Sequence, residues 1–164
     1  MTAPVGRDVP VLRCATFAEL STVELYRLLQ LRCEVFIVEQ GSPYPDVDGR
    51  DTEPGTRHLW LQDGDEVLAA LRVLEDGTDR SIGRVVTARA ARGRGLSTRL
   101  MREAIGLCAG RTIHLGAQTQ LKSWYAGFGF VRSGDDYDED GVMHLPMRRE
   151  AVGVPDGAAA DWQP

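Results

Sequence analysis

The chain has 164 residues, of which 43% are hydrophobic and 26% are charged, and its net charge at pH 7 is −5. This length and composition are typical of one water-soluble globular domain, and the acidic balance argues against a general nucleic-acid-binding protein. No stretch approaches the length of apolar sequence that a membrane span needs, and the first ten residues lack the apolar core of a signal peptide.

The spacing of apolar residues predicts a mixed α/β domain. Ser21 or Thr22 can cap a helix that has Glu24 in its first turn and runs to about Gln40. Further helices are expected at 97–109 and 121–128. The expected strands cover residues 11–17, 58–62, 67–75, 81–90, 112–118, 129–133 and 142–148.

Two segments fall outside these elements. Residues 41–56 form a long loop with three prolines and three glycines, and a loop of this length in a compact domain is often functional. Residues 152–164 are rich in proline, glycine and alanine. We therefore interpret residues 1–150 as a single domain and residues 151–164 as a C-terminal tail.

The cysteines predict a core role rather than a chemical one. Cys33 falls in helical register with Leu25, Leu29 and Phe36, and Cys108 lies on the apolar stripe of the helix at 97–109. Both are expected to be buried in a protein of the reducing cytoplasm. No histidine or second cysteine lies at ligand spacing from either, so a metal or catalytic role is not expected.

Residues 88–101, ARAARGRGLSTRLM, place two arginines and two glycines before an apolar-periodic helix. A glycine loop that leads into a helix N-terminus can bind an anion, because the first amides of the helix have no partner within it. The alternative is a surface turn with solvated arginines. The Walker sequence is absent, and the third glycine of a dinucleotide-binding loop is replaced by Thr98.

The acidic run DDYDEDG partly matches a calcium loop, with Asp136, Asp138, Asp140 and Gly141 in place. The twelfth position is Met147 instead of the bidentate glutamate, and the flanks are expected to be strands. A charged hairpin is therefore favoured over a calcium site. The three histidines, which are His58, His114 and His144, show no zinc-ligand spacing.

Residues 92–97, RGRGLS, resemble the Q/R-x-x-G-x-G/A loop of the GNAT superfamily of N-acetyltransferases, with Ser97 where glycine or alanine is usual. Segments 25–51, 82–96, 124–130 and 139–147 are similar, in this order, to the ElaA-like branch of that superfamily. The resemblance covers about residues 11–149. It implies a twisted mixed sheet of six to seven strands with flanking helices, splayed between strands four and five to admit the cofactor.

The resemblance also implies acetyl-CoA as the acyl donor and no metal. The loop amides would hold the pyrophosphate of the coenzyme, and the edge of the fourth strand would bind the thioester carbonyl and the pantetheine amides. The loop positions are Arg92, Gly93, Arg94, Gly95, Leu96, Ser97 and Thr98, and the strand positions are Val85, Val86 and Thr87. Tyr125 matches the family's Tyr-x-x-x-Gly-Phe and would protonate the leaving thiolate; the alternative is a packing role beside Trp124 and Phe128.

The general base is harder to place. Many GNAT enzymes carry a glutamate on the fourth strand, but SIGRVV contains no acidic residue and Arg84 is its only charge. Glu39 is the first candidate because it ends a helix that faces the long loop. The other candidates are Asp46, Asp48, Asp51, Glu53 and His58. An amine that binds in its neutral form needs no dedicated strong base.

These features predict an N-acetyltransferase that transfers an acetyl group to an amine of a small molecule or a protein by direct attack in a ternary complex. Acidic residues at 41–53 and 135–140 suit a cationic acceptor. The alternatives are a non-catalytic acyl-CoA-binding regulatory module and an enzyme that transfers a longer acyl chain. No nucleic-acid or membrane partner is expected, and the sequence leaves open whether two copies form a homodimer.

Overall fold

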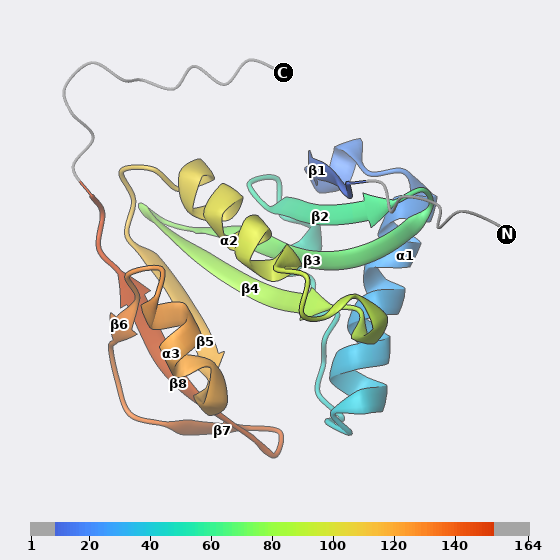
Figure 1. Ribbon diagram of the computed structural model, residues 1–164. Coiled ribbons are helices and arrows are strands. Elements are labelled where there is room, and N and C mark those ends of the chain that lie inside the picture. The colour runs from blue at the N-terminus through green and yellow to red at the C-terminus, as the bar shows by residue number, and fades with distance from the viewer. Residues whose placement is uncertain (1–8, 153–164) are drawn as a thin grey trace, which may run out of the picture.

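The computed structural model describes residues 9–152, which form one twisted sheet with helices on both faces (Figure 1). The sheet order is β1-β2-β3-β4-β5-β8-β6, and β7 pairs with β8 beside that path. The strands are β1 (Val11–Ala15), β2 (Arg57–Asp63), β3 (Glu66–Asp76), β4 (Asp79–Thr87), β5 (Ile113–Gln118), β6 (Val131–Arg132), β7 (Tyr137–Glu139) and β8 (Val142–Arg149). Within this range, no helix is both long enough and apolar enough to span a membrane.

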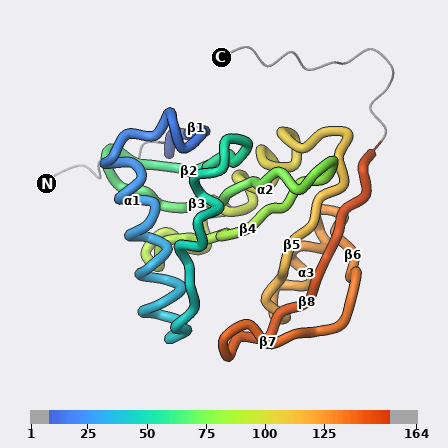
Figure 2. The backbone as a smooth tube through the Cα atoms, turned by 180° about the vertical axis from the view of Figure 1, so that it is seen from behind, coloured from blue at the N-terminus to red at the C-terminus, as the bar shows by residue number. Residues whose placement is uncertain are grey.

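The sheet consists of two antiparallel halves joined by one parallel pair. Strands β1 to β4 form a meander, β4 runs parallel to β5, and β8 runs antiparallel to β5, β6 and β7. Seen from behind, the half that contains β5 and β8 swings away from β4 (Figure 2). The expected mixed, splayed α/β fold is confirmed, and the described residues add β7 to the six to seven strands expected.

Helix α1 (Thr22–Arg32) begins as the sequence predicts. Its N-cap is Ser21, whose hydroxyl accepts from the amide of Glu24 at 3.2 Å, while the Glu24 carboxylate accepts from the amide of Ser21 at 2.9 Å. The helix continues as a π-helical segment, η2 (Cys33–Glu39), in which the amide of Gln40 donates to the carbonyl of Val35 at 3.0 Å. The helical region therefore ends where it was expected to end.

The prediction that Cys33 is buried is wrong. The face that packs on the sheet carries Leu28, Leu31, Val35 and Phe36, whereas Cys33 is exposed. The buried residues follow one helical stripe through α1 and η2, whereas Cys33 lies in line with Leu25 and Leu29, which are only partly buried at the edge of that stripe. Cys108, by contrast, is buried as predicted.

The central strand β3 separates two apolar clusters, and most of its length is buried on both sides. Helix α2 (Leu96–Leu107) packs on one face through Leu96, Leu100, Met101 and Ala104. Helix α1 and η2 pack on the other face, against Trp60, Val67, Ala70 and Val86. Two helical layers thus cover the first half of the sheet and leave its β4 edge between them.

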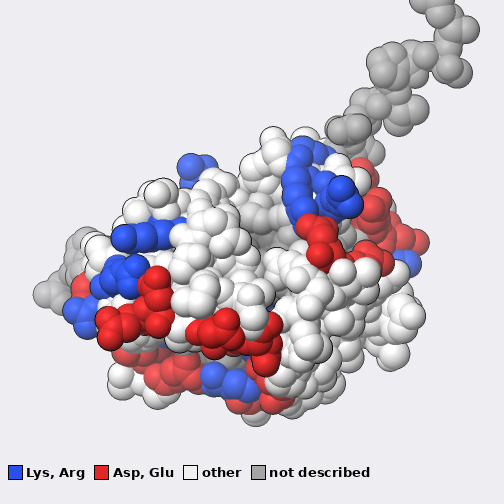
Figure 3. Space-filling model, turned by 90° about the horizontal axis from the view of Figure 1, so that it is seen from below, with Lys and Arg blue, Asp and Glu red and all other residues white. Residues whose placement is uncertain are grey.

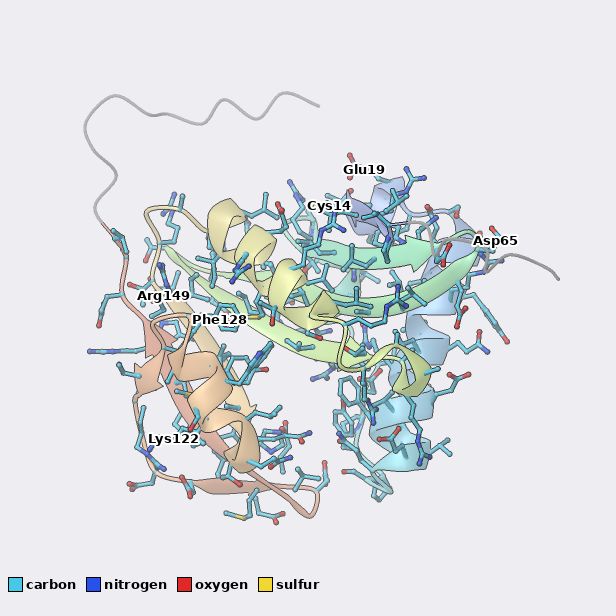
Figure 4. The ribbon with its side chains drawn as sticks, viewed as in Figure 1. Cys14, Glu19, Asp65, Lys122, Phe128 and Arg149 are labelled. Carbon is cyan, nitrogen blue, oxygen red and sulfur yellow. The ribbon has the colours of Figure 1, made fainter. Side chains whose placement is uncertain are left out.

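Helix α3 (Lys122–Ala126) packs beside β5 and β8. The Arg149 side chain, at the end of β8, donates through Nε to the carbonyl of Phe128 at 2.9 Å, and the two residues lie next to each other in Figure 4. The turn that follows α3 needs Gly129, whose φ of +89° is unfavourable for other residues. This contact fixes α3 against the second half of the sheet.

Buried ion pairs hold the long loop that contains the 3-10 turn η3 (Arg50–Thr52). Asp46 and Asp51, each 4% exposed, contact Arg32 of α1 at 2.8 and 2.7 Å. Arg72 of β3, which is 3% exposed, contacts Asp51 at 3.0 Å and Asp48 at 2.5 Å. These ion pairs anchor the loop to the core, and the carboxylates of Asp46, Asp48 and Asp51 are structural.

The ionised carboxylates stabilise this arrangement. Burial opposes ionisation of Asp51, but hydrogen bonds from Arg32 and Arg72 outweigh it and hold its pKa below the ordinary value. The hydrogen bond from Arg72 holds the pKa of Asp48 well below its usual range. Their contribution is complete above the unfolded carboxyl pKa of about 3.9 and is lost as the pH falls through the lower folded values.

Replacing Asp51 with alanine should strongly destabilise the fold, because it leaves Arg32 and Arg72 buried without their shared partner. We expect the free energy of unfolding to fall by about 3–5 kcal/mol in urea titrations at neutral pH. The matched control is Asp65→Ala, since Asp65 lies exposed at the β2–β3 turn (Figure 4); its effect should stay within about 0.5 kcal/mol. Equal effects of the two variants would contradict a stabilising role for the buried pairs.

Candidate active site

The site begins where β4 and β5 stop pairing. Their parallel register contains only two pairs, Arg80 with Ile113 and Ser81 with His114. Beyond these pairs β5 continues to pair with β8, whereas β4 continues to pair with β3. The second halves of β4 and β5 therefore diverge and leave an opening between them.

Irregular backbone in β4 contributes to this divergence. The pairing with β3 shifts register between Ala70 and Arg72, and Arg84 has a φ of +54°. A left-handed conformation at a non-glycine residue costs about 1–3 kcal/mol and persists only where surrounding contacts enforce it. Here the Arg84 guanidinium contacts Asp46 at 2.9 Å and lies 5.1 Å from the centre of the Tyr44 ring.

A cavity of about 720 Å³ occupies the opening, a volume suited to a small ligand or part of a cofactor. Its walls are η2, the loop before α2, the separated parts of β4 and β5, α3, and the β7–β8 hairpin. Of the expected site residues, those that line it are Glu39, Val85, Val86, Thr87, Arg92, Gly93, Gly95, Leu96, Ser97, Thr98 and Tyr125. Arg94 does not line it.

One end of the cavity has the geometry of an anion site. Gly93 and Gly95 have φ values of +76° and +72°, and Gly95 is the N-cap of α2. A Cβ at either position would point into open space, so what the glycines supply is the left-handed backbone that turns the loop into the helix. The first residues of α2, whose amides have no partner within the helix, line the cavity at this end.

Ser97, which departs from the usual family residue, has a local role. Its hydroxyl hydrogen-bonds the hydroxyl of Thr87 at the end of β4. This contact directs the serine side chain toward the strand and links the start of α2 to the strand edge. The extra oxygen is thereby accommodated within the protein.

Arg92 forms a bidentate ion pair with Glu39, at 2.7 and 3.0 Å. The hydrogen bond from Arg92 holds the pKa of Glu39 below its ordinary value. A carboxylate in this state is a weak proton acceptor. The structure therefore brings Glu39 to the cavity, as the sequence suggests, but in a pair that opposes its use as a base.

The other candidate bases lie elsewhere. Asp46, Asp48 and Asp51 belong to the buried ion pairs, and Glu53 contacts Arg50 at 2.9 Å. His58 is buried, and burial lowers its pKa while its Nε2 contacts the Asp51 carbonyl at 3.0 Å. The cavity wall contains none of these five side chains.

Tyr125 lies on α3 with 5% of its surface exposed, and it lines the cavity. Its ring packs edge-on against Trp124 at 4.8 Å and Phe130 at 6.3 Å between ring centres. Burial raises the pKa of its phenol to about 12. The hydroxyl therefore stays protonated at ordinary pH, which suits a hydrogen-bond donor.

The opposite end of the cavity contains residues that the sequence reasoning missed. They come from the loop after η2 and from the β7–β8 hairpin, and they are Ser42, Tyr44, Tyr137, Glu139, Val142 and His144. The sequence did contain a signal for them: in the expected hairpin, the alternation of side chains along each strand places Tyr137, Glu139 and His144 on one face. From below, acidic side chains gather in patches over this side of the molecule, interspersed with basic ones (Figure 3).

The acidic run that partly matched a calcium loop serves other contacts. Asp136 pairs with Arg132 at 2.6 Å, and Asp138 accepts from the amide of Gly141 at 2.9 Å. Across residues 9–152, no group of three histidine, cysteine, aspartate or glutamate side chains is arranged to hold a metal ion.

Comparisons with known proteins agree with this geometry. Residues 24–151 match the family described as "Acetyltransferase (GNAT) domain". A UPF0039 protein of Mycobacterium tuberculosis (strain H37Rv) is 45% identical over 140 residues, which are 82% of this chain and 90% of that protein. Protein ElaA of Escherichia coli (strain K12) is 40% identical over 142 residues, 82% of this chain and 93% of ElaA.

Solved structures give the same result. The crystal structure of Escherichia coli ElaA superposes with a TM-score of 0.81 over 86% of this chain and 99% of that one, at 38% identity. An acyl-CoA N-acyltransferase from Pseudomonas aeruginosa superposes with a TM-score of 0.82 at 41% identity, over 85% of this chain and 99% of that one. The splayed sheet, the glycine loop at α2 and these relatives together show that the chain belongs to the GNAT acetyltransferase family, in its ElaA-like branch.

Proposed function

We propose that the protein is an N-acetyltransferase that binds acetyl-CoA between β4 and β5 and transfers the acetyl group directly to an amine in a ternary complex. The observation that carries this proposal is the cavity, which joins a helix N-terminus, a strand edge and a buried tyrosine in one continuous wall. The 41%-identical structure named as an acyl-CoA N-acyltransferase supports the same ligand class. We assign the activity to residues 1–150 as one domain; the tail at 151–164 lies outside the described residues except for Ala151 and Val152.

The roles follow from position. The amides that bind the pyrophosphate are those of the loop and first turn of α2 that line the cavity, at Gly93, Gly95, Leu96, Ser97 and Thr98. The β4 edge at Val85, Val86 and Thr87 binds the thioester carbonyl and pantetheine, because its neighbour β5 has turned away. Arg92 contributes charge once the pyrophosphate competes with Glu39, whereas Arg94 acts only through the general potential of the loop.

Tyr125 then assists departure of the thiolate. A thiol has a pKa of about 8.5, well below the value of about 12 that burial gives this phenol, so complete proton transfer is uphill in the coenzyme-free site. A hydrogen bond to the developing negative charge on sulfur requires no transfer and is available at any ordinary pH. We therefore propose that the hydroxyl stabilises the leaving group mainly as a donor.

The function is tested by thiol release from acetyl-CoA with a panel of primary amines, together with calorimetric binding of CoA. Turnover that requires both an amine and acetyl-CoA, with the acetylated amine found by mass spectrometry, is the expected result. Binding of CoA without thiol release for any amine would instead support a non-catalytic acyl-CoA-binding module. Faster turnover with acyl-CoA donors of longer chain length would show that acetyl-CoA is not the preferred donor.

Replacing Gly95 with valine should weaken CoA binding while the fold survives. The side chain would strain a backbone with a φ of +72° and project toward the pyrophosphate. We expect the Kd for CoA measured by calorimetry to rise at least about tenfold, which corresponds to roughly 1.4 kcal/mol.

The matched control for this variant is Gly64→Val. Gly64 also has a positive φ with open space at its Cβ, but it lies in the β2–β3 turn away from the cavity. We expect the two variants to lose similar amounts of thermal stability, while only the Gly95 variant loses CoA affinity. That result would assign the loss of binding to the loop before α2. Normal CoA binding by the Gly95 variant would remove the loop from the binding site.

Replacing Tyr125 with phenylalanine keeps the ring packing and removes only the hydroxyl. We expect kcat to fall roughly tenfold, toward the low end of the effects seen for positioned acids, because a thiolate already leaves readily. The melting temperature and the affinity for CoA should be almost unchanged. Tyr26→Phe, at an exposed position of α1, is the control; an unaltered kcat in the Tyr125 variant would leave a packing role only.

A further inference from the structure

The face of the β7–β8 hairpin that lines the cavity presents three polar side chains to it. Tyr137 and His144 are directly opposite each other across the two strands, and Glu139 lies diagonally from His144 on the same face. All three line the cavity. Asp138 and Met143, which alternate with them, are absent from its wall, so the hairpin directs one particular set of side chains inward.

The hairpin is held in place across the cavity. Ser42, in the loop after η2, donates to the carbonyl of Asp140 in the hairpin turn at 3.0 Å. Gln118, the Cα partner of His144 on β5, donates to the side chain of Gln40 at 3.1 Å. Gly116 on β5 accommodates the Tyr137 hydroxyl, which would clash with any Cβ there. These contacts position the hairpin face before any ligand binds.

His144 has the tautomer that a proton acceptor needs. Its Nδ1 is 2.8 Å from the carbonyl of Val142, and a carbonyl only accepts, so Nδ1 carries a hydrogen. In the neutral ring Nε2 therefore has a free lone pair. The ring stacks on Tyr137 at 5.7 Å between centres, and the side chain is 12% exposed, so its orientation is fixed.

Glu139 lies beside this ring. Its carboxylate lies 3.4 Å from Nε2 of His144, and nearly half of its side chain is exposed. A carboxylate at this position attracts a cation that enters the cavity. Imidazole and carboxylate together are suited to receive a positively charged amine and to remove its proton.

We propose that His144 is the general base of this site and that Glu139 positions it and attracts a cationic primary amine as the acceptor. This inference rests on the proposed acetyl transfer. It assigns the two residues in place of Glu39, whose carboxylate is occupied by Arg92.

The step balances with the groups present. Nε2 of His144 takes one proton from the ammonium group, and the freed lone pair forms the new C–N bond with the thioester carbonyl. The C–S bond breaks, and its electron pair goes to sulfur. The attacking nitrogen loses a second proton, and the sulfur gains one with Tyr125 as hydrogen-bond donor. The products are the amide, the thiol and an imidazolium that returns its proton to solvent.

The test compares pH profiles of kcat for thiol release, measured with the most active amine of the panel. Replacing His144 with glutamine should lower kcat roughly 100-fold or more and abolish the fall in kcat on the acidic side of the profile. CoA affinity should be unchanged, since the hairpin lies at the opposite end of the cavity from the α2 loop. Replacing Glu139 with glutamine should raise KM for the cationic amine, because the cation that enters the cavity loses a nearby carboxylate.

Two variants serve as controls. His114→Gln removes a histidine of the same sheet that pairs with Asp79 and is not among the residues that line the cavity. Asp135→Asn removes a carboxylate of the same acidic run that likewise is not part of the wall. Both should retain the wild-type profile.

Other ionisable groups also face this space, so the profiles of several variants are needed. Tyr137 and Glu139 face His144 from β7, and the remaining titratable and charged residues of the wall are Glu39, Tyr44, Arg84, Arg92 and Tyr125. An acidic fall that persists in the His144 variant but disappears in Glu39→Gln would overturn our assignment in favour of Glu39. No turnover by the wild-type protein with any amine would overturn acetyl transfer itself, and the base with it.

Discussion

The separation of β4 and β5 after two residue pairs is the constraint on which the rest of the site depends. Where two strands stop pairing, their backbone N–H and C=O groups lose their hydrogen-bond partners in the sheet. A buried sheet normally avoids this cost. Here β8 pairs along the whole of β5 from Ile113 to Gln118 and holds it away from β4. The unpaired edge of β4 faces a cavity, where water or a ligand with amide groups can hydrogen-bond to its backbone.

The buried arginines and aspartates connect this opening to the opposite layer of the molecule. Arg32 of α1 and Arg72 of β3 share Asp51, and Arg84, on the distorted part of β4, contacts Asp46 and Asp48. Burying such charges is costly, and the arrangement is stable only while each has its partners. The same contacts that fix the loop after η2 thus also fix the backbone of β4 beside the cavity.

The charges within the cavity are divided between its two ends. Arg92 and the start of α2 make one end favourable for phosphates, and Glu139 makes the other favourable for a cation. Each of these groups has a close neighbour: Glu39 forms an ion pair with Arg92, and the His144 ring lies beside Glu139. Binding of an anion at the first end would compete with the existing ion pair between Arg92 and Glu39.

The sequence alone determined the order of the elements, a helix cap at Ser21 or Thr22 and the glycine loop, because these depend on local periodicity and on residues with special backbone preferences. The mixed, splayed sheet was predicted from the family resemblance. Through the resemblance to a known loop it also predicted most of the residues that line the cavity around the start of α2. It did not show that Cys33 would lie outside the buried stripe, that Arg92 would pair with Glu39, or that Tyr137, Glu139 and His144 would share one wall with Tyr125. Those outcomes depend on contacts between residues as many as 98 positions apart, as for Ser42 and Asp140, and on where β4 and β5 diverge. The local sequence pattern specifies neither these long-range contacts nor the point of divergence, because the path of each strand is set by the elements that pack against it.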